Sequence, residues 1–228
     1  MHRIKWLAGG TAIALLAATP ALAEPEIGTV FEREYRGAEG TRVGGDVRDL
    51  RWNNVVFAEE AVRTEAEEWT ELEFLDGTRL SVGSNSEVVL DRFVYDPAQS
   101  TGDAVITFGK GVFRFVSGDM QNKDGYQLVT PAATLEIRGT IFRLIIDAAN
   151  NVLLYVEQGV VEMISCGGDT EVIDAGDSAI AYGNCSGVAS RFGDVTLDHP
   201  DQRDGESASG GPIDSARTQS DSQDNNDP

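Results

Sequence analysis

Apolar and polar residues alternate along the middle of the chain, from about residue 53 to residue 192, with the period of two that is typical of β-strands. The clearest hairpin pattern joins residues 71–74 to residues 80–82 across a turn centred on Asp76-Gly77. Further short β-branched or aromatic runs, separated by Gly, Asn, Asp or Pro, cover residues 87–95, 104–108, 111–116, 126–129, 134–137, 141–146, 152–156, 160–164, 171–173 and 178–182. The pattern predicts an all-β domain with an antiparallel β-roll or sandwich-like sheet.

Composition divides the chain into zones around this domain. Residues 24–52 are charged and glycine-rich and are predicted to form an N-terminal lead-in, and the β domain is expected to span residues 53–195. From Asp198 onward the chain has eight acidic residues but only two arginines, Arg203 and Arg217, and Ile213 is the only large aliphatic residue. Such a segment cannot bury enough apolar surface to offset its ordering entropy. Residues 196–228 are therefore predicted to be a disordered acidic tail.

The first 23 residues have the layout of a secretory signal peptide. Two cations, Arg3 and Lys5, precede an apolar stretch over residues 6–18, and Pro20 and a small-x-small site follow it. We expect cleavage between Ala23 and Glu24. The apolar stretch is shorter than the roughly 20 residues that a spanning helix needs, which disfavours an uncleaved anchor. The pattern predicts a periplasmic or secreted protein with no stable membrane insertion after cleavage.

The net charge of the chain limits the classes of partner that can be expected. Eighteen Lys and Arg against 38 Asp and Glu give a formal charge of −20, and loss of Arg3 and Lys5 would make it −22 (16 minus 38). Binding to a phosphate backbone requires clustered cations, so nucleic acid is excluded as an expected partner. An anionic membrane surface is disfavoured for the same reason.

Two cysteines, Cys166 and Cys185, lie in the part of the chain expected to be exported. A disulfide between them is the expected state in an oxidising compartment. A free catalytic thiol is the alternative, but it lacks a partner base. His2 belongs to the predicted signal peptide, and His199 lies in the polar tail.

Three ordered blocks of sequence carry a family resemblance. Residues 74–90 include Asp76 and Gly77, residues 110–118 read Lys-Gly-Val-Phe-Arg-Phe-Val-Ser-Gly, and residues 129–142 lead from a Thr-Pro pair to Arg-Gly-Thr-x-Phe. The most specific positions of the third block are Thr130, Pro131, Arg138, Gly139, Thr140 and Phe142. Over about residues 53–165 the chain resembles the FecR domain.

The resemblance implies a role in recognition. The best-known FecR proteins join a cytoplasmic anti-sigma segment and one transmembrane helix to a periplasmic domain that receives a signal from an outer-membrane transporter. Only the predicted signal peptide precedes the expected mature sequence here, and no later apolar run exceeds seven residues. We therefore expect a stand-alone periplasmic FecR-domain protein without catalytic residues, cofactor or metal. It would contact an envelope protein or a cell-wall polymer through a β surface or a sheet edge.

Two other functions remain as alternatives. Asp169, Asp174 and Asp177 beside glycines suggest a calcium-dependent adhesion module, although no EF-hand spacing is present. The many acidic residues also allow a carboxylate-based glycoside hydrolase. No Ser-His-Asp order, Gly-x-Ser-x-Gly motif or Cys/His zinc spacing supports an enzyme.

Arginines in apolar strands are the remaining candidates. Arg138 and Arg143 are each expected to pair with a carboxylate, with an anion or peptide-terminus site as the alternative. Between them, Gly139 would permit a bulge or a close approach of two strands. In the preceding block, Phe113 and Phe115 should share one face of a strand while Arg114 points to the other.

Overall fold

The computed structural model describes residues 25–31, 37–122 and 124–190, and within them all regular secondary structure is β-strand. The prediction of an all-β fold is therefore confirmed. The strands are β1 (Glu26–Val30), β2 (Glu39–Thr41), β3 (Val47–Asp49), β4 (Val55–Phe57), β5 (Glu60–Arg63), β6 (Thr70–Phe74), β7 (Arg79–Val82), β8 (Glu87–Asp96), β9 (Thr101–Phe108), β10 (Gly111–Val116), β11 (Tyr126–Val129), β12 (Ala133–Ile146), β13 (Val152–Ser165), β14 (Thr170–Asp174), β15 (Ser178–Ala181) and β16 (Val188–Ser190). None of the described residues forms a helix capable of crossing a membrane. The predicted signal peptide, its cleavage site and the acidic tail lie outside the described residues.

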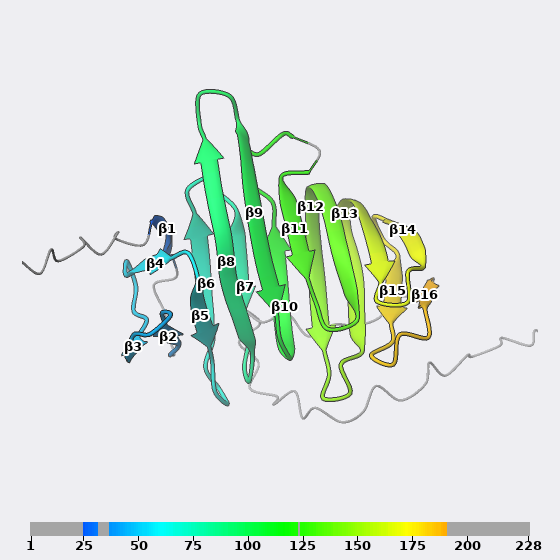
Figure 1. The fold of residues 1–228 in the computed structure, drawn as a ribbon, viewed down its shortest axis with the longest axis horizontal. Coiled ribbons are helices and arrows are strands. Elements are labelled where there is room, and N and C mark those ends of the chain that lie inside the picture. Colours follow the sequence, from blue (N-terminus) through cyan, green and yellow to red (C-terminus); the bar gives the residue numbers. More distant parts are fainter. Residues whose placement is uncertain (1–24, 32–36, 123, 191–228) are drawn as a thin grey trace, which may run out of the picture.

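The strands form one curled sheet. Its hydrogen-bonded order is β3-β2-β5-β8-β9-β11-β12-β10-β7-β6-β1-β4, and β13 pairs with β12, β14 and β15, with β16 beyond β15. Figure 1 shows the chain advancing along the long axis, from the blue and cyan strands β1–β4 at one end to the orange strands β15 and β16 at the other. The predicted antiparallel arrangement is correct for every pair except β9 and β11, which are parallel.

The hairpin predicted around Asp76-Gly77 is the pair β6 and β7. Leu72 lies opposite Leu80, and both side chains are fully buried. Gly77 has a φ of +80°, a conformation that glycine adopts without steric cost. The alternation of apolar and polar positions therefore identified the buried face of this hairpin directly.

A bulge at the centre of β12 divides the sheet into two arms. Residues 134–136 pair with β11, whereas residues 141–146 pair with β10. The two runs predicted here are one 14-residue strand, and the register against β13 shifts between Arg138 and Ile141. Gly139 has a φ of +60°, and Gly159 on β13 has a φ of +82°. A Cβ atom on Gly159 would lie 2.6 Å from the Gly139 carbonyl oxygen, so the predicted bulge and the close backbone approach are both present.

The two arms face each other across a common core. Pairs of aromatic rings join them: Phe74 on β6 stacks on Phe93 of β8, with ring centroids 5.1 Å apart. Phe108 on β9 meets Phe113 of β10 edge-on at 4.9 Å. Phe113 and Phe115 are fully buried and share one face of β10, as predicted. Such ring pairs contribute beyond their buried area, and they fix the spacing of the arms.

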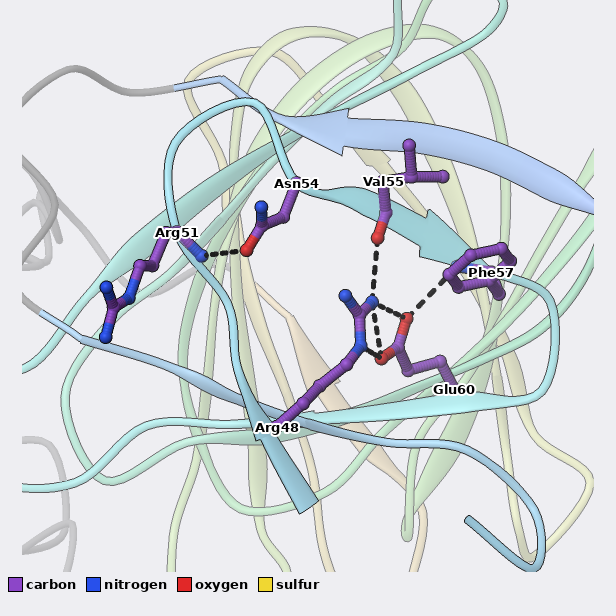
Figure 2. A network of polar contacts seen from close by, with 6 residues as sticks. All are labelled: Arg48, Arg51, Asn54, Val55, Phe57 and Glu60. Atoms are coloured by element: carbon purple, nitrogen blue, oxygen red, sulfur yellow. Dashed lines mark hydrogen bonds and ion pairs between the residues drawn. The ribbon is translucent and has the colours of Figure 1, made fainter. Parts of the chain in front are cut away.

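A polar network around the ion pair between Arg48 on β3 and Glu60 on β5 joins the two ends of the strand order. Arg48 on β3 donates from Nε and a terminal nitrogen to the carboxylate of Glu60, at 2.9 and 2.8 Å, and from the terminal nitrogen to the Val55 carbonyl on β4 at 2.7 Å. The Phe57 N–H donates to the same carboxylate at 3.1 Å. Figure 2 shows the guanidinium between the Glu60 side chain and the Val55 carbonyl. Because β3 and β4 end the two arms, this network closes the roll at its N-terminal end.

Strand pairing begins upstream of the predicted domain edge at residue 53. Residues 28–30 of β1 pair with β6, and β2 pairs with β5. Strands from the segment interpreted as a lead-in, residues 24–52, thus lie in the sheet. Strands β2 and β3 have three residues each, which is too few to show a period.

Replacing Gly159 by alanine tests the bulge. Gly159→Ala should destabilise the domain by several kcal/mol, because the new Cβ meets the Gly139 carbonyl oxygen in a backbone conformation that L-residues rarely adopt. Gly176→Ala is the matched control, since Gly176 has a φ of +91° and a Cβ added there would meet no atom within 4 Å. The control should lose only about 1–2 kcal/mol. Urea unfolding measures both, and equal losses would contradict the close approach.

Glu60→Gln tests the closure of the roll. The side chain of Glu60 is fully buried, so loss of its charge leaves Arg48 without its anionic partner and should cost about 2–4 kcal/mol in unfolding free energy. The neighbouring Glu59→Gln, at an exposed position, should change stability by less than about 0.5 kcal/mol. A Glu60→Gln protein as stable as wild type would rule out a stabilising role for the ion pair.

Candidate functional site

Asp76, the acid of the first family block, is buried and bonded within the domain. Its carboxylate accepts hydrogen bonds from the Thr78 N–H at 2.9 Å, the Thr78 hydroxyl at 2.8 Å and the Tyr126 hydroxyl. The Gly118 N–H donates to the Tyr126 oxygen at 3.1 Å. Burial, and then the hydrogen bond and charge of Asp76, raise the pKa of Tyr126, so its hydroxyl stays protonated and keeps donating. The Asp76-Gly77 turn is thereby tied to β11.

The Thr-Pro block also makes internal contacts. The Thr130 hydroxyl donates to the Ala133 carbonyl at 2.6 Å and accepts from the Ala133 N–H at 2.9 Å, which closes the turn at Pro131 before β12. Phe142 is fully buried and stacks on Phe115 with centroids 5.3 Å apart. The Thr140 N–H donates to the Ser117 hydroxyl at 2.9 Å. These residues hold the fold together and present no reactive group to solvent.

The two arginines singled out in the sequence have different surroundings. Arg143 forms the expected ion pair, with its Nε 2.6 Å from Glu157. The expectation for Arg138 is wrong: it is exposed, and no ion pair within the described residues involves it. Arg138 immediately precedes Gly139 in the bulge, where the alternation of faces is interrupted and both residues turn to solvent.

Arg114 and Arg143 stand side by side on the outer face of the sheet. They lie directly opposite each other on β10 and β12. The carboxylate of Glu157 on β13 forms ion pairs with a terminal nitrogen of Arg114 at 3.0 Å and with Nε of Arg143 at 2.6 Å. Each of the three side chains is 21–24% exposed. Burial alone would raise the pKa of Glu157, but the hydrogen bonds and charges of the two arginines outweigh it and hold the pKa below its usual range.

A row of apolar side chains adjoins these arginines outside the main core. Consecutive cross-strand partners, Ile145, Leu153, Ile180 and Ala189, run across β12, β13, β15 and β16. They form a second cluster with Tyr155 and Tyr182. Tyr155 lies directly opposite Arg143, so the cluster and the arginine pair are continuous. We call this surface the outer patch, comprising Arg114, Arg143, Glu157, Ile145, Leu153, Tyr155, Ile180, Tyr182 and Ala189.

Ser178 adds an unusual polar group to the outer patch. It lies opposite Tyr155 and two residues before Ile180, and therefore on the same face of β15. The residue is fully buried, yet its hydroxyl has no hydrogen-bond partner in the described part of the chain. An unmade hydrogen bond at a buried group costs free energy. The Ser178 hydroxyl is thus an unsatisfied buried group within the described residues.

The predicted disulfide between Cys166 and Cys185 is confirmed, with Cα atoms 5.1 Å apart. It ties the end of β13 to the loop between β15 and β16. The Cys166 N–H also donates to the Ala132 carbonyl at 2.8 Å, beside the Thr-Pro turn. A structural disulfide indicates an oxidising compartment.

The aspartates considered for calcium lie in and around turns. The Asp177 N–H donates to the Asp174 carbonyl at 3.0 Å between β14 and β15, and the Asp169 carbonyl accepts from the Ser165 N–H at 2.8 Å. Over the described ranges, no group of three or more His, Cys, Asp and Glu side chains is placed to hold a metal ion.

Comparison with known proteins assigns the central part of the chain. Residues 60–162 match the family model described as FecR protein. This segment is a FecR domain. The match confirms the resemblance carried by the three sequence blocks, and the regulatory character of the FecR family supports a role in signalling or regulation.

Solved structures with a similar shape were also found. Two crystal structures of a "putative anti-sigma factor" from Parabacteroides distasonis ATCC 8503 align with a TM-score of 0.47 and 13% identity. Each alignment spans 59% of this chain and 60% of that chain. No curated protein matches the sequence.

The outer patch was missed in the sequence. The outward direction of Arg114 followed from Phe113 and Phe115, which flank it, but its neighbours come from strands far along the chain. The run at residues 152–156 was the available signal, because it carries large apolar residues on both faces. Such two-sided strands indicate a second apolar surface.

Glu157→Gln tests the charged part of the outer patch. It should lower the unfolding free energy by about 1–3 kcal/mol at pH 7, because two arginines lose their shared acceptor charge. Since the folded pKa of Glu157 is depressed, its stabilisation is present above the unfolded pKa of about 4.3 and is lost as pH falls through the folded value. Urea unfolding from pH 7 to pH 3 should therefore show wild type and variant converging below about pH 4.

Glu87→Gln provides the control, because Glu87 pairs with Arg63 at 2.9 Å in an exposed setting. Its effect should stay within about 0.5 kcal/mol at every pH. A constant gap between Glu157→Gln and wild type down to pH 3 would contradict the depressed pKa.

Proposed function

We propose that this protein is a non-catalytic, periplasmic FecR-domain protein that acts in envelope recognition or signalling by binding an envelope protein or a cell-wall polymer. The observation that carries the proposal is the outer patch. It joins a cluster of apolar and tyrosine side chains outside the core to a pair of arginines.

The composition of the outer patch fits a binding surface. Tyrosine and arginine are enriched at the energetic centres of protein interfaces, where an apolar body and a polar tip serve together. Tyr155 and Tyr182 are partly exposed beside Leu153 and Ile180, which are each 7% exposed. The β12–β13 pair beneath them is the longest in the sheet, so the patch stands on a rigid support.

Three observations support the compartment. The FecR match covers residues 60–162, and the FecR domain is periplasmic in members of the family. The disulfide suits an oxidising environment. The first 23 residues carry the pattern of a signal peptide.

Photocrosslinking in cells tests the proposal. Benzoylphenylalanine at Tyr155 should yield a discrete adduct with one envelope protein or with a cell-wall fragment. The same group at Val94, which is 60% exposed on the β8–β9 hairpin, should yield no such adduct. Identical adducts at both positions, or none at Tyr155, would count against recognition through the outer patch.

A matched pair of substitutions measures the contribution of the outer patch. Tyr155→Ser should weaken capture of that partner about tenfold or more, as expected for a tyrosine at an interface centre. Val94→Ser should leave capture unchanged. Circular dichroism of both variants checks that the fold is retained.

A further inference from the structure

We infer that two copies of this protein associate through the outer face of the arm in which β12 pairs with β11. Five outward-facing residues of β12, β13 and β14 form the contact, which we call the dimer face: Glu136, Arg138, Val160, Glu162 and Val172. The dimer face belongs to the opposite arm from the outer patch. The inference is therefore independent of the proposed function.

The residues of the dimer face alternate in sequence with residues of the core. Each of them adjoins one or two buried side chains, which are Leu135, Ile137, Val161, Met163 and Ile173. Successive side chains of a strand point to opposite faces, so the five residues point outward. Strand pairing then places them side by side, with Arg138 opposite Val160, Glu136 opposite Glu162, and Glu162 opposite Val172.

The charges of the dimer face lack partners in the described part of the chain. Arg138 is the only arginine there that has neither an ion pair nor a ring contact. Glu136 and Glu162 lie directly opposite each other, which is unfavourable for like charges, and no cation within the described ranges pairs with them. Asp174, opposite Val160, is likewise without a cation there. Because acidic residues outnumber Lys and Arg by 38 to 18, an arginine without an acidic partner is unexpected.

The apolar part of the dimer face is open to solvent. Val160 is 44% exposed and Val172 is 58% exposed. Gly139, next to Arg138, is exposed as well, and a Cβ atom added to it would meet no atom within 4 Å. Unlike the core of the domain, this surface can therefore bury further apolar area when a partner covers it.

The mixture of charges selects a second copy of the chain as the occupant. A basic partner would satisfy the acids of the dimer face but would repel Arg138. An acidic partner would pair with Arg138 but would also face three carboxylates. The dimer face carries both charges beside exposed valines, so a second copy supplies an acid for the arginine and an arginine for the acids.

The positions of these groups suit a two-fold contact. Arg138 and Glu162 lie one strand apart and two residues along, which separates their backbones by about 8 Å. A two-fold axis that lies midway between them, in the plane of the contact, exchanges the two positions. Arg138 of each copy then meets Glu162 of the other, and Val160 meets its own counterpart beside the axis. A contact of this kind closes at two copies.

The dimer should be weak and should present two outer patches. Two chains with a formal charge of −20 repel each other, although salt screens this repulsion beyond about 8 Å at physiological ionic strength. A contact of this small size is typical of transient association. Because the two arms lie on opposite sides of the core, each copy keeps its outer patch free. A partner with repeated binding sites would then be held by both copies at once.

Sedimentation velocity of the purified full chain tests the inference over about 5 to 500 µM, the range in which weak dimers form. Wild type should shift from monomer to dimer as the concentration rises. Arg138→Glu and Glu162→Arg should each self-associate at least tenfold more weakly, because like charges then meet across the contact. An equimolar mixture of these two variants should dimerise within about threefold of wild type, since both contacts regain opposite charges.

Arg63→Glu is the matched control. It makes the same change of charge at a side chain that is 60% exposed on β5, four strands away from β12 in the sheet. It should leave self-association within about threefold of wild type. A wild-type protein that stays monomeric up to the highest concentration would overturn the inference. A mixture that associates no better than its separate variants would do so too, as would an equal loss in Arg63→Glu.

The dimer and the proposed recognition can fail separately. The sedimentation experiment contains no envelope partner, so a monomeric result leaves the Tyr155 crosslink in cells as the test of recognition. Absence of a Tyr155 adduct in cells, together with association of the mixed variants, would support the dimer and refute recognition through the outer patch.

Discussion

The close approach of Gly139 and Gly159 determines the architecture of this domain. At any one position, a strand can pair with only one neighbour along each edge. Two strands share one edge of β12: β11 pairs with its first half and β10 with its second half. The bulge between Arg138 and Ile141 separates these halves and turns the strand. Each half then begins a different arm, and the arms fold over a shared core. A side chain on Gly159 would hold the two backbones apart, and the positive φ of Gly139 favours glycine there as well.

The outer patch is a consequence of the same constraint. Beyond the bulge, β12 and β13 stay in register from the Phe142–Val156 pair to the Ile146–Val152 pair. This register places Arg143 opposite Tyr155. The pairing with β10 brings Arg114 opposite Arg143, although 29 positions separate the two in sequence (143 minus 114). The family-motif residues act beneath this surface: Asp76 and Thr130 hold turns, and Phe142 fills the core. The proposed recognition surface and the core thus lie on opposite faces of the same strands.

A buried ion pair closes the N-terminal end of the roll. At the N-terminal end the short strands β3 and β4 have few apolar contacts to offer, and the fully buried Glu60 gathers donors from Arg48 and Phe57. A buried carboxylate is tolerated only when its hydrogen bonds are made. At the C-terminal end the Cys166–Cys185 disulfide joins β13 to the loop before β16. This link holds β16, and with it the point where the tail begins, beside the outer patch.

Alternation of apolar and polar residues determined the fold class, most strand positions and the β6–β7 hairpin, because a half-buried strand records its inner face in every second residue. The two cysteines, in a chain with the sequence pattern of an exported protein, predicted their own pairing, and the motif blocks predicted the FecR domain. The sequence could not show that two predicted runs form one bulged strand, that β9 and β11 run parallel, or that the segment before residue 53 joins the sheet. The sequence predicted an ion pair for Arg138, but the bulge turns this side chain to solvent. The outer patch was decided only by tertiary structure, since cross-strand neighbours depend on register, and register between distant strands is set by the packed core.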